Sequence, residues 1–270
     1  MHKSTEKVFE SVIEKVSSIT EVKSIGISGA KSQLPAAGEG DIDFFIYCDE
    51  IPDIEKRKKI LSNLDTEICN IKMNIFEGGH WGTGDFIEIN GVETWLMFFK
   101  ITDVIRNIDE ILSGKYPDKI DNYYYPIGRV GMLEKITILY DKNEFLKSLK
   151  EKLRIYPEAL LKKLIDYHID KLSDMEDIER AVYRKDVLFY HFALDIAIDH
   201  FLQAIFALNK TYFPSRKRSL SFINIFEIKP NYCGERILDI IQLGSQESNM
   251  KTSYELLLSL ISELIELSKM

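Results

Sequence analysis

Cysteine and long apolar runs are scarce in this sequence, and positively charged residues are fewer than negatively charged ones. Its three cysteines, Cys48, Cys69 and Cys233, form no CxxC or Cys/His spacing, so we expect neither a disulfide framework nor a structural zinc site. Lysine and arginine total 35 against 43 aspartate and glutamate, which gives a net charge of −8. This balance argues against a surface built to grip a nucleic-acid backbone, so no nucleic-acid partner is expected.

Leader peptides and membrane spans need uninterrupted apolar segments, and none is visible here. Near the N-terminus, Glu6 and Glu10 interrupt the apolar core that a signal peptide would need. The most apolar later stretch, residues 187–208, contains Asp195 and Asp199, which is not typical of a membrane span. We therefore expect a cytoplasmic protein with no membrane partner.

The N-terminal half alternates between helical and strand patterns. Apolar spacing predicts, in order, a helix over 4–18, strands over 23–28 and 42–48, a helix over 53–66 and a strand over 68–76. Residues 86–89 and 92–99 flank Asn90-Gly91, the commonest two-residue signal for a tight hairpin turn. These elements predict a mixed β-sheet with helices.

The C-terminal half has a helical period almost throughout. Helices are predicted over 143–153, 157–172, 175–209 and 252–270. The fold class expected is therefore α+β, with a mixed-sheet domain over residues 1–145 and a helical bundle domain over residues 146–270.

One short segment combines small residues with paired carboxylates. In SIGISGAKSQLPAAGEGDIDFFIYC a strand ends near Gly29, and Asp41 and Asp43 open the next strand. Side chains two apart on a strand point to the same face, so these carboxylates converge. Carboxylate oxygens suit Mg²⁺, and the small residues leave backbone N–H groups open to phosphate oxygens. The alternative is an ordinary acidic turn at the start of a strand.

This segment resembles the signature of the nucleotidyltransferase superfamily, which includes DNA polymerase β and the aminoglycoside and lincosamide nucleotidyltransferases. The C-terminal half also resembles the helical half of a related bacterial family of uncharacterised function. The segments that carry this resemblance are YPEALLKKLI, YRKDVLFYHFALD and LQAIFALNKTYFPSRKRS. In the signature, a Gly-Ser pair closes the first strand and an Asp-x-Asp pair opens the second.

The resemblance implies roles for individual residues. Gly29 matches the family glycine, Ala30 stands where the serine is expected, and Ser28 or Ser32 would replace its hydroxyl. These four positions are the expected nucleotide-binding turn. Asp41 and Asp43 match the metal-binding carboxylates.

A third carboxylate is expected on a later strand. The best match is Glu93, which should share a face with Trp95 and Met97 because alternate residues of a strand do so. Glu88, on the partner strand of the hairpin, is the competitor. Asp41, Asp43 and Glu93 are therefore the expected catalytic and metal-binding residues.

Further polar residues admit two interpretations each. His191, Asp195 and Asp199 share one helix face. Either one of these carboxylates acts as a general base toward an acceptor hydroxyl, or the three residues form a hydrogen-bonded structural network. The run 216–218 (Arg-Lys-Arg) is either an anion site or a solvated loop. Trp81, between glycines, is either a stacking surface in a ligand-covering loop or a partly buried turn residue.

The resemblance implies a Mg²⁺-dependent nucleotidyltransferase. Such an enzyme would use ATP, or another nucleoside triphosphate, to move a nucleoside monophosphate to a hydroxyl of a small-molecule acceptor. An aminoglycoside-like antibiotic would be one such acceptor, and the negative net charge suits a cationic one. The alternative is a nucleotide-binding or protein-interaction module, antitoxin-like or regulatory, that has lost turnover.

Overall fold

The computed structural model describes residues 4–29, 34–64, 68–115 and 125–269. They form an α+β protein, as predicted, with a mixed sheet and a helical C-terminal part. The chain divides into two compact units, each built from two stretches. Unit 1 comprises Met1–Glu110 and Arg129–Ile155, and unit 2 comprises Ile111–Gly128 and Tyr156–Met270.

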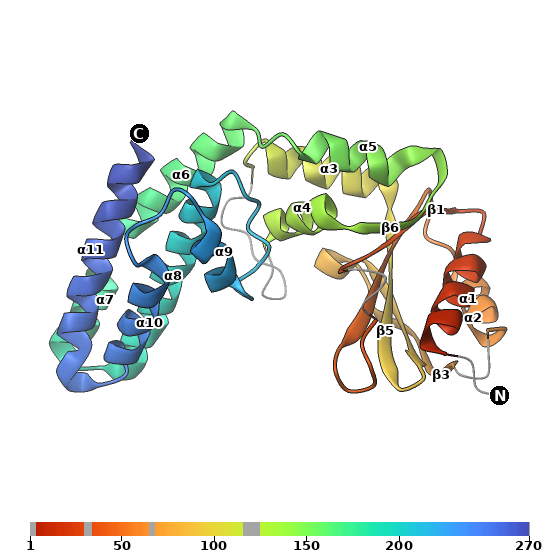
Figure 1. Ribbon diagram of the computed structural model, residues 1–270, viewed down its shortest axis with the longest axis horizontal. Coiled ribbons are helices and arrows are strands. Elements are labelled where there is room, and N and C mark those ends of the chain that lie inside the picture. The colour runs from red at the N-terminus through yellow and green to blue at the C-terminus, as the bar shows by residue number, and fades with distance from the viewer. Residues whose placement is uncertain (1–3, 30–33, 65–67, 116–124, 270) are drawn as a thin grey trace. The chain divides into compact units, whose positions relative to one another are not determined.

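Unit 1 is built on a mixed sheet. Its described strands are β1 (Val22–Ile27), β2 (Asp41–Cys48), β3 (Ile68–Phe76), β4 (Thr83–Ile89), β5 (Val92–Lys100) and β6 (Thr137–Asp141). Their spatial order is β3-β4-β5-β2-β1-β6, and Figure 1 labels β1, β3, β5 and β6. Strands β2 and β5 run parallel, and the other neighbouring pairs run antiparallel. The predicted β4–β5 hairpin is confirmed: Asn90 and Gly91 both have positive φ, at 49° and 80°, as a type I′ turn requires.

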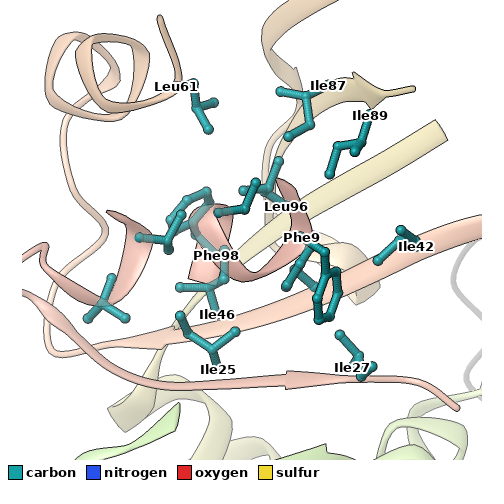
Figure 2. Packing of buried hydrophobic residues seen from close by; sticks show 14 of the residues in the cluster. Phe9, Ile25, Ile27, Ile42, Ile46, Leu61, Ile87, Ile89, Leu96 and Phe98 are labelled. Atoms are coloured by element: carbon teal, nitrogen blue, oxygen red, sulfur yellow. The ribbon is translucent and has the colours of Figure 1, made fainter. Parts of the chain in front are cut away.

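One face of this sheet is covered by helices α1 (Thr5–Ser17) and α2 (Ile54–Ser62). Alternation in the strands sends aliphatic and aromatic residues to this face, and α1 contributes its own apolar stripe. Phe9 of α1 stacks on Phe44 of β2 with ring centroids 5.0 Å apart, and Figure 2 shows Ile25, Ile46 and Phe98 in the same core.

The opposite face is also apolar over part of its area. Phe45 and Tyr47 of β2 lie here, and each stacks on Phe99 of β5. The ring centroid of Phe145, in helix α5 (Phe145–Leu153), lies 5.7 Å from that of Tyr47. A Cβ at Gly26 of β1 would lie 2.4 Å from the Ile136 side chain, so any larger residue there would require this side chain to move.

Unit 2 is helical. Its helices are α6 (Glu158–Leu172), α7 (Glu176–Arg184), α8 (Val187–Leu208), α9 (Ser219–Ile225), α10 (Cys233–Gly244) and α11 (Met250–Ser268). Helix α8 packs against α6, α7, α10 and α11. Its length and apolar composition would allow a membrane span, but most of it is buried among these neighbours, as in the central helix of a globular bundle.

The sequence-based assignment was wrong or incomplete at several points. The helix predicted over 175–209 is two helices, because Lys185 adopts left-handed φ and ψ of 57° and 34°. Asp186 then caps α8, its side chain accepting a hydrogen bond from the Phe189 N–H at 3.0 Å. Helices α3 (Ile101–Leu112), α4 (Pro126–Lys135), α9 and α10 and strand β6 were not predicted. Short 3₁₀ turns complete the described elements at Gly79–Trp81, Lys142–Glu144 and Glu247–Asn249.

Candidate functional site

Strands β2 and β5 bring the predicted carboxylates onto one face of the sheet. Their parallel register pairs Asp41 with Glu93 and Asp43 with Trp95. Because alternate residues share a face, Asp41, Asp43 and Glu93 all project from the side opposite α1 and α2. Neighbouring strands are about 4.8 Å apart and alternate residues about 6.7 Å apart. The three carboxylates thus originate within one small area.

This end of the face is open to solvent. Asp41 and Glu93 are exposed and Asp43 is half-buried, whereas Phe45 and Phe99, farther along the same strands, are buried. The open area is therefore the beginning of β2 and β5, next to the connection between β1 and β2. Small-molecule phosphates and cations can reach carboxylates placed in this way.

Glu88, the competing third carboxylate, lies on the same face. The antiparallel β4–β5 register sets it directly opposite Glu93, and Asn70 Nδ2 donates a hydrogen bond to it at 3.3 Å. A row of Glu88, Glu93 and Asp41 therefore crosses three strands. Like charges directly opposite one another are destabilising, so this row favours a bound cation. Glu93, not Glu88, is adjacent to Asp41.

The donor set fits Mg²⁺ in its chemistry, since Mg²⁺ takes hard oxygen ligands and commonly uses one or two carboxylates together with substrate phosphates. Within the described residues, no group of three or more His, Cys, Asp or Glu side chains is placed so as to hold a metal ion. Asp41 and Glu93 are exposed, and exposed side chains exchange rotamers rapidly. The register places the three carboxylates on neighbouring strands, and their side chains would have to turn to enclose an ion.

The predicted nucleotide-binding turn is described only in part. Ser28 and Gly29 follow β1 and are exposed, whereas Ala30 and Ser32 lie outside the described residues. Gly29 has a φ of 83°, a left-handed conformation that favours glycine. Its carbonyl accepts a hydrogen bond from Thr137 Oγ1 at 2.5 Å. Extending the β1–β2 register by one residue beyond the Ile27–Phe44 pair would bring Ser28 opposite Asp43.

Arg129 of α4 is a residue that the sequence analysis did not single out. Its guanidinium lies 4.4 Å from the ring centroid of Phe99, 5.9 Å from that of Phe45 and 6.0 Å from that of Trp81. Phe45 follows Asp43 by two residues and shares its face. A positive charge therefore lies over the same face as the carboxylates, held by aromatic rings through cation–π contacts. Trp81 is half-buried in a 3₁₀ turn.

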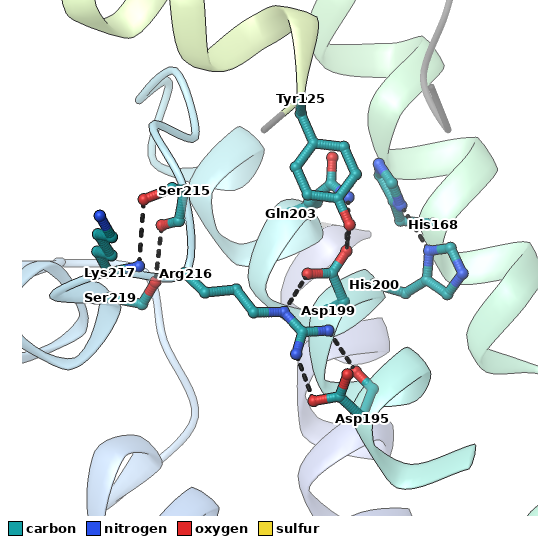
Figure 3. Close-up of polar contacts among 10 residues, drawn as sticks. All are labelled: Tyr125, His168, Asp195, Asp199, His200, Gln203, Ser215, Arg216, Lys217 and Ser219. Carbon is teal, nitrogen blue, oxygen red and sulfur yellow. Dashed lines mark hydrogen bonds and ion pairs between the residues drawn. The ribbon is translucent and has the colours of Figure 1, made fainter. Parts of the chain in front are cut away.

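Unit 2 contains a separate polar network centred on Asp199 of α8 (Figure 3). This buried carboxylate accepts hydrogen bonds from the Tyr125 hydroxyl, from Gln203 Nε2 at 3.0 Å and from Arg216 Nε at 2.6 Å. Arg216 also bonds the Asp195 carboxylate, and its Nη2 donates to the Asp195 backbone carbonyl at 2.7 Å. Asp195 and Asp199 thus belong to a hydrogen-bonded network that fixes the segment after Phe213 to α8.

His191 does not join that network. Its Nε2 lies 3.3 Å from Ser245 Oγ, at the end of α10. The helix predicted over 175–209 contained both Arg184 and His191, but Arg184 belongs to α7 and His191 to α8.

Part of the chain matches a known family model. Residues 125–218 match a model described as a domain of unknown function (DUF4037), and this segment contains Tyr125, Asp199 and Arg216. None of the curated proteins matches the chain. The chain is similar to a nucleotidyltransferase-like protein from Exiguobacterium sibiricum, solved by crystallography, at 12% identity and a TM-score of 0.48. The match covers 98% of this chain and 75% of the other.

Proposed function

We propose that this protein is a Mg²⁺-dependent nucleotidyltransferase that moves a nucleoside monophosphate, AMP from ATP, to a hydroxyl of a small-molecule acceptor. The observation that supports it most is the parallel register of β2 and β5, which sets Glu93 opposite Asp41. Three carboxylates then share an open face beside the Ser28–Gly29 turn.

The chain's own residues would contribute in two ways. Asp41, Asp43 and Glu93 would hold the metal, which when bound neutralises phosphate charge and aligns the attacking and leaving oxygens. Backbone N–H groups of the Ser28–Gly29 turn would donate to phosphate oxygens. In the reaction the acceptor hydroxyl loses its proton to solvent and its oxygen forms a bond to the α-phosphorus. The bond from that phosphorus to the bridging oxygen breaks, and pyrophosphate leaves.

A cationic acceptor is the class proposed. The acidic row of Glu88, Glu93 and Asp41 gives this face a negative potential, and such a field concentrates cations. Aminoglycoside-like antibiotics belong to that class, and modification of such a compound in the cytoplasm would confer resistance.

The test combines nucleotide binding with turnover. We expect ATP to bind more tightly with Mg²⁺ than with a chelator, and pyrophosphate to be released when a panel of cationic hydroxyl-bearing acceptors is supplied. Asp41→Asn and Asp43→Asn should each lower turnover by at least about 100-fold, because loss of even an outer-shell partner of a metal costs 10–100-fold. Asp103→Asn, which changes an exposed aspartate of α3, is the matched control.

Two results would contradict this function. Equal ATP affinity with and without chelator would show that the triphosphate does not bind through a metal ion. Mg²⁺-dependent binding with no pyrophosphate release from any nucleotide and acceptor pair would favour the alternative, a nucleotide-binding module without turnover, as the alanine at position 30 allows.

We expect Glu93, not Glu88, to be the third carboxylate of the proposed metal site. Glu93→Gln should reduce turnover as strongly as Asp41→Asn, because Glu93 is the cross-strand neighbour of Asp41. Glu88→Gln, one strand farther away, should reduce it by less than about 10-fold, because only one half-buried charge outside the metal site is lost. The reverse order of effects would assign the metal to Glu88.

A further inference from the structure

Unit 2 contains a pocket that the proposed reaction does not use. It has a volume of about 360 Å³ and lies between α8, α10 and the segment 216–220. This volume is within the range of small-molecule sites, at its lower end. All of its lining residues belong to unit 2.

The walls of the pocket are mainly aliphatic. The apolar residues of the two helices are Leu194, Ile198, Leu202, Ile237, Leu238 and Ile241. Leu238 is 53% exposed and Ile241 is 40% exposed, so this aliphatic surface is open to solvent. Apolar surface that is gathered in a concave site marks a place where an apolar group binds.

The charged lining residues are Arg216, Arg218 and Asp195. Arg216 is already engaged by Asp195 and by the buried Asp199, as Figure 3 shows. Arg218 is exposed and forms no ion pair with any residue that the structure describes. Its backbone has a φ of 62°, which non-glycine residues seldom adopt. The lining therefore carries one positive charge in excess, on Arg218.

We propose that this pocket binds a small amphipathic anion. Its apolar body would lie against α8 and α10, and its carboxylate or sulfonate would pair with the Arg218 guanidinium, which presents two parallel N–H donors to such groups. The Arg216–Asp195–Asp199 network holds one wall of the site in place before a ligand arrives. This site is independent of the carboxylates on the sheet.

The probe for the test is 8-anilinonaphthalene-1-sulfonate, an aromatic body with one sulfonate, titrated against the full-length protein by fluorescence. We expect saturable binding at one site. Decanoate should displace the probe, and decylammonium, which has the same tail and the opposite charge, should not.

Variants locate the site. Leu238→Glu and Ile241→Glu each place a negative charge on the pocket wall and should weaken probe binding at least about 10-fold. Arg218→Gln should weaken it by a similar factor, because a hydrogen bond to a charged group contributes about that much. The matched controls are Leu258→Glu on α11, where the leucine is 39% exposed, and Arg184→Gln on α7. Circular dichroism verifies that each variant is folded.

Unchanged probe binding in all three pocket variants would overturn the site. Equal displacement by decanoate and decylammonium would overturn its anionic selectivity. Concentration-dependent self-association that Leu238→Glu abolishes would show that a second copy of the chain, not a small molecule, occupies the pocket.

Discussion

At the scale of single residues, unit 1 contains a buried ion pair. Arg57 of α2 and Asp85 of β4 have side chains only 3% and 0% exposed, and Arg57 Nη1 lies 2.6 Å from Asp85 Oδ2. The Asn74 N–H donates to the other oxygen of Asp85 at 3.0 Å, and Phe98 lies 5.0 Å below the guanidinium. Each charge is thus satisfied inside the core only while the other is present.

We predict that Arg57→Met destabilises the protein by about 3–5 kcal/mol at pH 7, the cost of a buried charge that has lost its partner. Burial raises the pKa of Asp85 above its ordinary 3.8, although the Asn74 N–H and Arg57 oppose this. A raised folded-state pKa favours folding when the carboxyl is protonated, and that contribution is lost as pH rises from 3.8 through the raised value. Without Arg57 the pKa rises further, so the penalty should shrink toward pH 4.5.

Urea unfolding at pH 7 and pH 4.5 checks this. The double variant Arg57→Met/Asp85→Leu should regain most of the lost stability at pH 7, because it removes both charges. An equal loss for Arg57→Met at the two pH values would show that packing, not the charge of Asp85, is responsible.

Site residues that are positioned by the local pattern of one strand can be predicted from the sequence, whereas those positioned by contacts between distant segments cannot. Asp41 and Asp43 were placed on one face from alternation along a single strand, and Glu93 from alternation along another. That β2 lies beside β5, which makes Glu93 the neighbour of Asp41, depends on pairing between strands about fifty residues apart. Arg129 carries no local signal at all, because its aromatic partners lie in three other segments.

At the scale of elements, the break between α7 and α8 is the clearest departure from periodicity. Apolar spacing continues across it, so a single helix was the natural prediction. The ending depends on one left-handed residue, Lys185, where glycine is the usual choice. Asp186 as a cap was the available signal.

We predict that Lys185→Gly is more stable than Lys185→Ala by about 1 kcal/mol, because alanine retains the steric cost of the left-handed conformation. Both variants lose the exposed pair of Lys185 with Glu247, at 3.2 Å, so their difference isolates the backbone. Asp186→Ala should lose about 1 kcal/mol with the cap of α8. Thermal unfolding of the three variants measures this, and equal stability of the glycine and alanine variants would contradict it.

The elements that were missed divide by cause. Helix α3 has apolar residues at helical spacing (Val104, Ile108 and Ile111), so its sequence does carry a helical signal. Strand β6 is only five residues long, and it is a strand because it pairs with β1. Its formation is a tertiary effect, which local propensity does not predict.

At the scale of the whole molecule, each unit draws on two separate stretches of chain. Tyr125 belongs to the short stretch of unit 2. Its hydroxyl bonds Asp199, and its ring centroid lies 5.8 Å from that of Phe213. Burial and the bond to Asp199 raise the pKa of Tyr125. Nine residues before it belong to the segment 116–124, which lies outside the described residues.

We predict that Tyr125→Phe destabilises unit 2 by about 1.5–3 kcal/mol, the value of a hydrogen bond to a charged group, and that Tyr125→Ala costs more, because it also removes the packing of the half-buried ring. Hydrogen–deuterium exchange should increase more in α8 than in β2. Phe9→Ala, a core truncation in unit 1, is the matched control and should show the reverse order. Equal loss of protection in both places for both variants would contradict this.

The pairing of β1 with β6 has a consequence for synthesis on the ribosome. Ser24 of β1 donates a hydrogen bond to Asp141 at 2.6 Å across 117 positions of sequence. At 5–20 residues per second, roughly 6–23 s therefore pass between the synthesis of β1 and that of its partner strand β6. During that interval the nascent sheet presents an unpaired edge, and the stretch Ile111–Gly128 emerges before the helices of its own unit. The nascent chain is then most exposed to wrong pairing with a neighbouring polypeptide.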